Sequence, residues 1–333
     1  MVISMDLGPD SYDIVLERGV LRRAGETLDL NRKVMLVTDA GVPPAYADAI
    51  EAQCASCTRR AVVPGEAHKS FAELEAILTE MLQAGFTRGD CVVALGGGMV
   101  GDLAGFAASC YMRGVDFYNL PTTVLSQVDS SIGGKTAVNL GGIKNIAGAF
   151  YQPKKVLIDA DVLQTLPARQ VSAGLAEALK SSLIRDAALF ERFERGVSAD
   201  DMEDVIAASL RIKKDVVEQD EKERGLRRIL NFGHTIGHGI EAVTGLYHGE
   251  CVALGMLAMC SDAVRARLLP VLESLRLPTS VHADAERVYE AMLHDKKAVG
   301  GSLTVVRVET PGDCVLEPVA PESLREKIAQ VVK

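Results

Sequence analysis

The first hundred residues alternate short aliphatic runs with helical patterns, and no other feature constrains the fold of this chain as strongly. Residues 33–38, 60–64 and 91–95 have the composition of buried strands. Before the third run, Ser70 and Glu73 match a capping box, and apolar residues follow at helical spacing. Because strands that alternate with helices form parallel sheets, the sequence predicts an α/β fold with a mostly parallel sheet.

The second half of the chain has mostly helical sequence patterns. Helical patterns cover residues 168–184, 199–218, 231–244, 250–267 and 284–294, and residues 302–308 form the one clear late strand. A length of 333 residues agrees with two domains. We therefore expect an α/β domain at residues 1–155 and a mainly α-helical domain at residues 156–333.

Composition excludes several classes of protein. The net charge of −9 and the absence of Trp disfavour binding of nucleic acid or of an anionic membrane. No apolar run is long enough to span a membrane, and the N-terminus lacks the apolar core of a secretory signal. Seven Cys, an odd number, predict reduced thiols and a cytoplasmic location. Cys54 and Cys57 form a CxxC, which is more simply interpreted as small residues between a helix and a strand.

Residues 96–102 contain the spacing GxGxxG between a predicted strand and a predicted helix. Glycines at this place let the backbone approach a phosphate, which the helix N-terminus also attracts. The acidic residue expected about 20 positions later is absent, so the standard dinucleotide fingerprint is incomplete. A tight strand-to-helix turn is the alternative interpretation.

Residues 120–136 combine many hydroxyls with Asp129, a Gly pair and Lys135. The Gly pair and Lys135 suit an anion, and Asp129 suits a substrate hydroxyl. Lys144 and Asn145 follow in a second Gly-flanked loop. Interspersed apolar residues anchor the segment to a core, which disfavours a merely solvated loop.

A third cluster has the residue types of a metal site. His234 and His238 are four residues apart, on one helical face, and His248 follows soon after. Glu177 adds a carboxylate in an apolar stretch, with Lys180 one turn later. Imidazoles and a carboxylate with an open position are typical of catalytic zinc. The spacing leaves open which two histidines bind, and it does not match the HExxH of zinc proteases.

Basic residues accompany these motifs. They are Arg113, Lys135, Lys144, Lys180, Lys213, Arg227, Lys296 and Lys297. Together the motifs predict a nucleotide cofactor, a divalent metal and an anionic substrate that meet between two domains.

With these motifs, the chain resembles the 3-dehydroquinate synthase family. The matching strings are PGEAHKSF, GGGMVGDLAGF, YMRG, PTTVLSQVDSSIGGKTAVN, KNIAGAFYQP, TLPARQVSAGLAEALK, LRRILNFGHTIGHGIE, HGECVALGM and HDKKAVG, in family order. The resemblance implies an N-terminal NAD-binding α/β domain, a C-terminal helical metal-binding domain and a cytoplasmic homodimer. The implied reaction converts 3-deoxy-D-arabino-heptulosonate 7-phosphate, a phosphorylated carboxylate, into 3-dehydroquinate and phosphate in the shikimate pathway.

The resemblance also assigns residues. Glu177, His234 and His248 resemble ligands of Zn²⁺, with Co²⁺ as an alternative, and His238 then faces the substrate. The residues that resemble NAD contacts are Asp39, Glu66, Lys69, Gly98, Met99, Val100, Gly101, Asp102, Thr122, Thr123, Lys135, Lys144, Val162, Leu163, Gln164 and Thr165. Those that resemble substrate contacts are Asp129, Lys135, Asn145, Lys180, Lys213, Arg227, Asn231, His238 and Lys297. Arg113 resembles the arginine that reaches the phosphate from the partner subunit. Gly239 stands where Ala is usual, a departure that costs a helix about 1 kcal/mol.

The implied chemistry begins with oxidation of the C5 hydroxyl by NAD⁺, which acidifies a neighbouring C–H so that phosphate leaves. Return of the hydride and an aldol closure regenerate NAD⁺. Rival interpretations are another sugar phosphate cyclase such as 2-deoxy-scyllo-inosose synthase, a metal-dependent polyol dehydrogenase, and a non-catalytic NAD-binding regulator. Arg227 and Asn231 favour a substrate with a carboxylate, provided that the run to His234 is helical or turns into a helix at Asn231. An exposed surface arginine is the alternative for Arg227.

Overall fold

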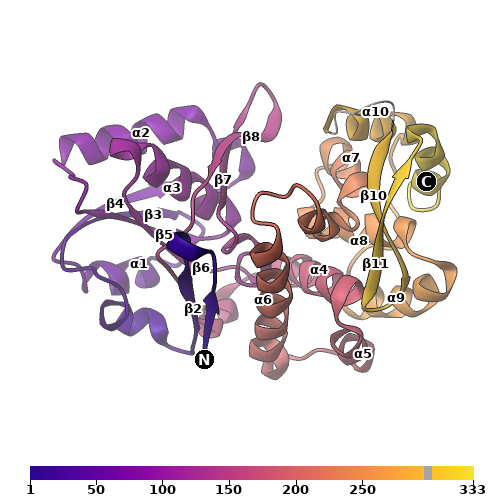
Figure 1. Ribbon diagram of the computed structural model, residues 1–333, viewed down its shortest axis with the longest axis horizontal. Helices are drawn as coiled ribbons and strands as arrows, with labels where there is room; N and C mark the ends of the chain where they lie inside the picture. Colours follow the sequence, from indigo (N-terminus) through magenta and orange to yellow (C-terminus); the bar gives the residue numbers. More distant parts are fainter. Residues whose placement is uncertain (296–301) are drawn as a thin grey trace. The chain divides into compact units, whose positions relative to one another are not determined.

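The computed structural model describes residues 1–295 and 302–333 and divides the chain into two compact units, Met1–Leu166 and Pro167–Lys333 (Figure 1). The sequence placed this boundary eleven residues earlier, after residue 155. The first unit extends further because β9 (Lys155–Ile158) is a strand of its sheet and a 3-10 turn, η6 (Ala160–Thr165), follows it. In the described part of the chain, no helix is both long and apolar enough to cross a membrane.

The first unit is built on a seven-stranded sheet whose order is β1-β2-β9-β6-β5-β3-β4. Besides β9, its strands are β1 (Val2–Met5), β2 (Tyr12–Leu16), β3 (Lys33–Asp39), β4 (Ser56–Val62), β5 (Cys91–Gly96) and β6 (Asp116–Pro121). Only the pair β1–β2 is antiparallel, so the predicted mostly parallel sheet is confirmed. All six residues of β5 are buried, as expected of a central strand covered on both faces.

Three helices cover this sheet. They are α1 (Pro44–Glu51), α2 (Phe71–Gln83) and α3 (Gly98–Cys110). Helices α2 and α3 pack on the face formed by Met35, Val37, Val92 and Ala94, and α1 lies on the opposite face (Figure 1). The predicted capping box is half formed: Ser70 accepts from the Glu73 backbone N–H at 3.3 Å, whereas the Glu73 carboxylate pairs with Arg60.

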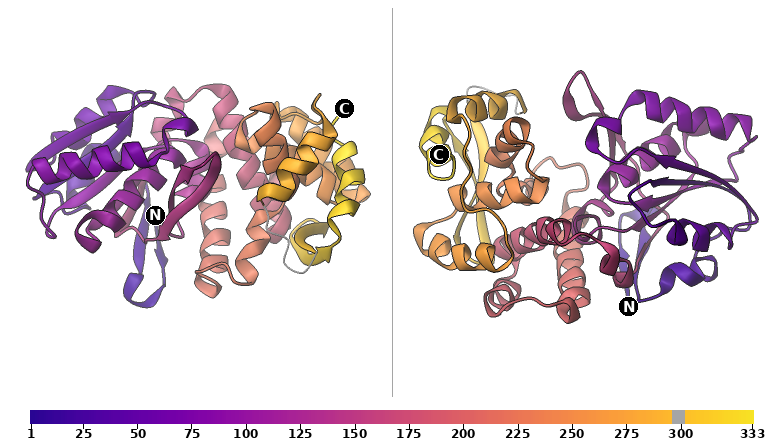
Figure 2. Two further views of the ribbon diagram at one scale, coloured as in Figure 1. Left: turned by 90° about the horizontal axis from the view of Figure 1, so that it is seen from above. Right: turned by 180° about the vertical axis from the view of Figure 1, so that it is seen from behind.

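A separate antiparallel hairpin joins β7 (Lys135–Leu140) to β8 (Ile143–Phe150), and it extends beyond the sheet in Figure 2. The remaining short segments of this unit are η1 (Gly8–Asp10), η2 (Val20–Glu26), η3 (Glu66–His68), η4 (Tyr111–Arg113) and the π turn η5 (Ser126–Ser130). Cys54 follows α1 and Cys57 lies in β4, which is the helix-to-strand position that the sequence indicated. Both are free thiols.

The second unit is mainly helical. Its helices are α4 (Ala168–Arg185), α5 (Ala187–Arg195), α6 (Met202–Gln219), α7 (His234–Thr244), α8 (His248–Met259), α9 (Asp262–Ser274), α10 (Ala285–Asp295) and α11 (Leu324–Ala329). Its 3-10 segments are η7 (Ala199–Asp201), η8 (Leu226–Asn231) and η9 (Pro321–Ser323), and its hairpin joins β10 (Leu303–Thr310) to β11 (Asp313–Val319).

Two expectations for this unit are wrong. The single helix predicted at residues 250–267 is two helices, because Cys260 bridges to Val308 of β10 and Ser261 caps α9 by accepting from the Val264 N–H at 3.3 Å. Strand β11 was missed because its residues are half or fully exposed, so they show no apolar alternation.

Candidate functional site

Three helices of the second unit bring the predicted metal ligands together. His234 opens α7, His238 lies one turn later, and His248 opens α8. The ligand nitrogens of these three histidines all lie within 4.8 Å of one another. From the middle of α4, Glu177 Oε1 lies 3.7 Å from His234 Nε2 and 3.5 Å from His248 Nε2. The sequence assigned Glu177 to this cluster by residue type and by resemblance, and the packing of α4 against α8 brings it beside histidines that follow it by 57 and 71 residues.

Glycines make this close packing of backbones feasible. A Cβ on Gly249 would lie 1.8 Å from the Ala173 carbonyl of α4, and one on Gly255 would lie 1.9 Å from the Gly233 carbonyl. Gly233 itself precedes α7 with φ of 78°, a conformation that favours glycine. These glycines therefore let α8 pack against the backbone of α4 and of the residue before α7.

His234 and His248 are each oriented by a contact at Nδ1, in addition to the approach of Nε2 to Glu177. His234 Nδ1 lies 3.1 Å from the Phe232 carbonyl, and His248 Nδ1 lies 3.0 Å from Glu241 Oε2. Both rings therefore present Nε2 to Glu177, as imidazoles do when Nδ1 is held by an oxygen and Nε2 binds a metal. Sequence reasoning missed Glu241, although it ends the same His-rich string.

The Glu177 carboxylate is buried, and its two oxygens differ. Oε2 accepts from Lys180 Nζ at 2.5 Å, whereas the buried Oε1 has no hydrogen-bond partner. Burial by itself would raise the pKa of Glu177, but Lys180 and the two imidazoles lower it well below its usual range. A buried, ionised oxygen without a hydrogen-bond partner, facing two Nε2 atoms, fits a divalent cation.

The two imidazoles titrate in opposite directions. Burial lowers the pKa of His234 well below its usual value, so this ring is neutral at pH 7. Burial would also lower the pKa of His248, but the adjacent carboxylates of Glu177 and Glu241 raise it to about 10. A metal that binds here displaces the proton of His248. The His238 ring centroid lies 5.3 Å from that of His234 and 5.6 Å from that of His248, so position alone keeps His238 a candidate ligand too.

Three buried cations lie in elements that pack on one another. Lys180 of α4, Lys213 of α6 and Arg227 of η8 have exposed fractions of 1, 6 and 1%. Such burial is rare for Lys and Arg and needs compensating negative charge. The interpretation of Arg227 as an exposed surface residue is therefore wrong.

The run from Arg227 to His234 is not one helix, and the α-helix does not begin at Asn231 either, so neither condition of the sequence argument is met. Residues 226–231 are a 3-10 segment, and α7 begins at His234. Arg227 Nη1 donates to the Glu221 carbonyl at 2.5 Å, and Asn231 Nδ2 donates to Glu223 Oε1 at 2.8 Å. Both side chains thus contact residues 221–223, the segment that precedes η8.

In the first unit, most predicted cofactor contacts gather at the carboxyl ends of parallel strands, where such sheets bind nucleotides. Asp39 ends β3, Gly96 ends β5 and residues 98–102 open α3 after it, Thr122 and Thr123 follow β6, and residues 162–165 follow β9. Because Gly97 and Gly98 have no Cβ, the segment after β6 can approach them closely. A Cβ on either would lie 3.1 Å or less from Thr123 or Ser130. The side chains of Val100, Val162 and Leu163 are buried, so these three residues offer a ligand only their backbone.

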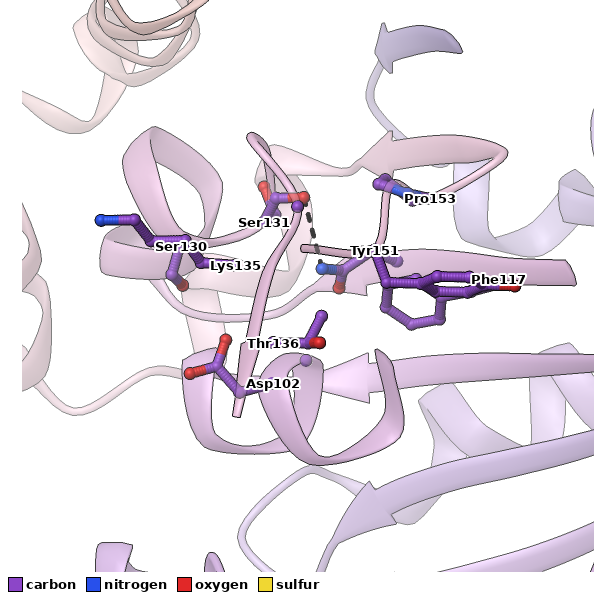
Figure 3. Close-up of a pocket in the computed structure, with 11 residues that line it drawn as sticks. Asp102, Phe117, Ser130, Ser131, Lys135, Thr136, Tyr151 and Pro153 are labelled. Atoms are coloured by element: carbon purple, nitrogen blue, oxygen red, sulfur yellow. Dashed lines mark hydrogen bonds between the residues drawn. The ribbon is translucent and has the colours of Figure 1, made fainter. Parts of the chain in front are cut away.

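Lys69 joins this region to the β7–β8 hairpin. Its side chain is 3% exposed, and Nζ donates to Asp102 Oδ2 at 2.5 Å and to Asn145 Oδ1. Asp102 and Lys135 line one small pocket with Ser130 (Figure 3). The remaining lining residues are Gly101, Phe117, Asn119, Ser131, Gly134, Thr136, Tyr151 and Pro153.

The other predicted site residues are distributed as follows. Asp129 lies in η5, Glu66 in η3, and Lys144 in β8. Arg113 is exposed and has φ of 69° at the end of η4. Lys297, like Lys296, lies outside the described residues.

Comparisons with known proteins match both units. Residues 59–173 match the family model "3-dehydroquinate synthase N-terminal", and residues 174–298 match "3-dehydroquinate synthase C-terminal". A 3-dehydroquinate synthase of Pelobacter propionicus is 40% identical over 349 residues, covering 97% of each chain.

Two solved structures are similar over nearly the whole chain. A 2-deoxy-scyllo-inosose synthase complexed with carbaglucose-6-phosphate, NAD⁺ and Co²⁺ is 25% identical, with a TM-score of 0.89 and coverage of 98 and 99%. A 2-epi-5-epi-valiolone synthase from Streptomyces hygroscopicus with NAD⁺ and Zn²⁺ bound is 27% identical, with a TM-score of 0.86 and 96% coverage of each chain.

Proposed function

The chain belongs to the 3-dehydroquinate synthase family, and from this premise we propose that it converts 3-deoxy-D-arabino-heptulosonate 7-phosphate into 3-dehydroquinate and phosphate. Such an enzyme is a phosphate-eliminating lyase of the shikimate pathway. One observation carries the proposal: buried Glu177 faces two imidazoles, and its helix, which also buries Lys180, packs on two elements that each bury a further cation. A metal and an anionic substrate explain both features together.

NAD and a divalent metal are the cofactors that this proposal requires, and the solved relatives carry NAD⁺ with Co²⁺ or Zn²⁺. We propose Zn²⁺, held by Glu177, His234 and His248, because one carboxylate and two imidazoles leave the open position that catalytic zinc keeps. When bound, the metal polarises substrate hydroxyls and NAD⁺ takes up a hydride transiently.

Residues of the second unit keep this ligand set ready. Lys180 neutralises one oxygen of Glu177, which keeps the carboxylate ionised in a buried place. The Phe232 carbonyl and Glu241 hold the two imidazoles with Nε2 toward Glu177. His238, on the same helical face as His234, is left to contact the substrate in this proposal.

Residues of the first unit bind the cofactor and part of the substrate in this proposal. The backbone of residues 96–102 and the N-terminus of α3 suit the pyrophosphate of NAD. Asp129, Lys135 and Asn145 contact the substrate, and Lys69 orients Asn145 through a hydrogen bond. We further propose a cytoplasmic homodimer in which Arg113, exposed at the end of η4, reaches the phosphate bound by the partner.

The carboxylate of the substrate would be recognised by Arg227, with Lys213 as a second positive charge. Loss of a charged hydrogen bond costs about 2–4 kcal/mol, so we expect Arg227→Ala to lower kcat/KM roughly 30- to 1000-fold. Because Arg227 is buried and also donates to the Glu221 carbonyl, the variant should melt at a lower temperature as well. Arg228, its exposed neighbour, provides the matched control: Arg228→Ala should change neither value.

Phosphate release tests the proposal against its rivals. The wild-type enzyme with NAD⁺ and Zn²⁺ should release phosphate from the heptulosonate phosphate and not from glucose 6-phosphate. Release from glucose 6-phosphate alone would indicate an inosose-forming cyclase. Absence of release from both would favour the polyol dehydrogenase or the non-catalytic regulator, which NADH accumulation with a polyol distinguishes. An unchanged kcat/KM of Arg227→Ala would remove the reason for assigning the carboxylate to this residue.

A further inference from the structure

Asn139 of β7 lies opposite a bulge in β8. One residue, Asn139, faces residues 144–146, because the register of the hairpin shifts at this point. The flanking pairs are Val138 with Ala147 and Leu140 with Ile143. Bulges redirect side chains and are frequent beside active sites. This bulge carries Lys144 and Asn145, which the proposed function assigns to NAD and substrate.

At the bulge, the Asn139 side chain forms a hydrogen bond to β8 in place of the regular backbone pairing. Its Oδ1 accepts from the Asn145 backbone N–H at 2.9 Å. Asn145 has φ of 56°, a left-handed conformation that Asn tolerates better than most residues. One acceptor therefore holds Asn145 in a conformation that a regular strand would not contain.

The nitrogen of the Asn139 side-chain amide binds a second segment, η3. Asn139 Nδ2 donates to the Glu66 carbonyl at 3.1 Å and to Glu66 Oε1 at 2.9 Å. The Asn139 backbone N–H donates to the Lys69 carbonyl at 2.8 Å. Lys69 in turn donates to Asp102 and to the Asn145 side chain. Hydrogen bonds thus link η3, α3 and the hairpin around Asn139.

We propose that Asn139 is a positioning residue that couples the cofactor side of the site, through Glu66, to the substrate side, through Asn145. This inference rests on the proposed function, which assigns those two roles. The two ends of the amide have separate tasks: the acceptor orients Asn145, and the donors orient Glu66. Neither the motifs nor the comparisons with known proteins give Asn139 a role.

Three variants separate the tasks. Asn139→Ala removes both ends of the amide. Asn139→Asp keeps an acceptor for Asn145 and replaces the donor with a second carboxylate beside Glu66. Leu140→Ala is the control, because Leu140 is the next residue of β7 and its side chain is 54% exposed.

Calorimetry should show NAD binding weakened roughly 10- to 100-fold in both Asn139 variants, which is the range for hydrogen bonds to a charged group. At saturating NAD, kcat should fall by a similar factor in Asn139→Ala and stay near the wild-type value in Asn139→Asp. A residue that merely stabilises the hairpin would not separate NAD affinity from kcat in this way. Leu140→Ala should keep both values.

Amide hydrogen exchange gives a readout that needs neither substrate nor metal. The Asn145 N–H should exchange slowly in the wild type and in Asn139→Asp, and faster in Asn139→Ala. Unchanged NAD affinity in both variants, or an equal loss of kcat in both, overturns the inference. A wild type that binds NAD but releases no phosphate overturns the proposed function instead. In that case the NAD affinities of the variants still show whether Asn139 acts on NAD binding through Glu66.

Discussion

Gly239 of α7 faces the backbone of α10, and replacing it by Ala tests how closely these helices pack. A Cβ at this position would lie 2.5 Å from the Val288 carbonyl, 3.1 Å from Met292 Cβ and 3.3 Å from the Met292 nitrogen. The carbonyl belongs to a helix and cannot swing away as a side chain can. We therefore expect the overlap to cost the upper part of the usual range for overpacking, about 2–3 kcal/mol.

Helix propensity acts in the opposite direction. Ala is favoured over Gly by about 1 kcal/mol inside a helix. The difference predicts that Gly239→Ala lowers the free energy of unfolding by about 1–2 kcal/mol. The sequence alone predicts the opposite sign, because it identifies Gly239 only as a weak point of the helix where Ala is usual.

Calorimetric melting shows whether Gly239→Ala lowers or raises the free energy of unfolding. The protein should be metal-free, since bound metal would add its own stabilisation. With roughly 2–4 °C per kcal/mol for a unit of this size, we expect the second unit of Gly239→Ala to melt a few degrees below the wild type. Gly25→Ala is the control: the nearest atom to its Cβ would be 3.5 Å away, so its melting temperature should hold or rise slightly. A higher melting temperature for Gly239→Ala would refute the packing argument.

The remaining predictions concern the metal and the cofactor. Glu177→Gln, His234→Ala and His248→Ala should each purify without metal, whereas His238→Ala should keep the metal and lose turnover; metal analysis that showed the reverse for His238 and His248 would exchange their roles. Glu241→Ala should weaken metal affinity about 10- to 100-fold, with Glu241→Gln less affected because its amide oxygen still accepts from His248, and competition with a chelator measures both. NADH should not accumulate during turnover, and one NADH per product, seen by absorbance, would indicate a polyol dehydrogenase.

Much of the first unit could be predicted because its signals are local. The strands β3 and β5 are continuous aliphatic runs, and α2 has a helical period and a Ser70 cap, so these elements and the helix α3 after the glycines lie where the sequence places them. The glycine loop could also be placed, since a parallel sheet directs the loop after β5 to its carboxyl edge. The break between α8 and α9 was missed, because it depends on a bridge from Cys260 to β10, almost 50 residues away.

In the site, the sequence determined which residue types are present, and the histidine spacing and the resemblance identified the ligands. Tertiary structure decided their environment: which oxygen of Glu177 faces the imidazoles, that Glu241 holds His248, and that Arg227 is buried rather than exposed. The same holds for Asn139, whose contacts to Glu66 span 73 residues of sequence. Periodicity and caps report on neighbours along the chain. Burial, pKa and hydrogen-bond partners depend on neighbours in space, and only packing brings those together.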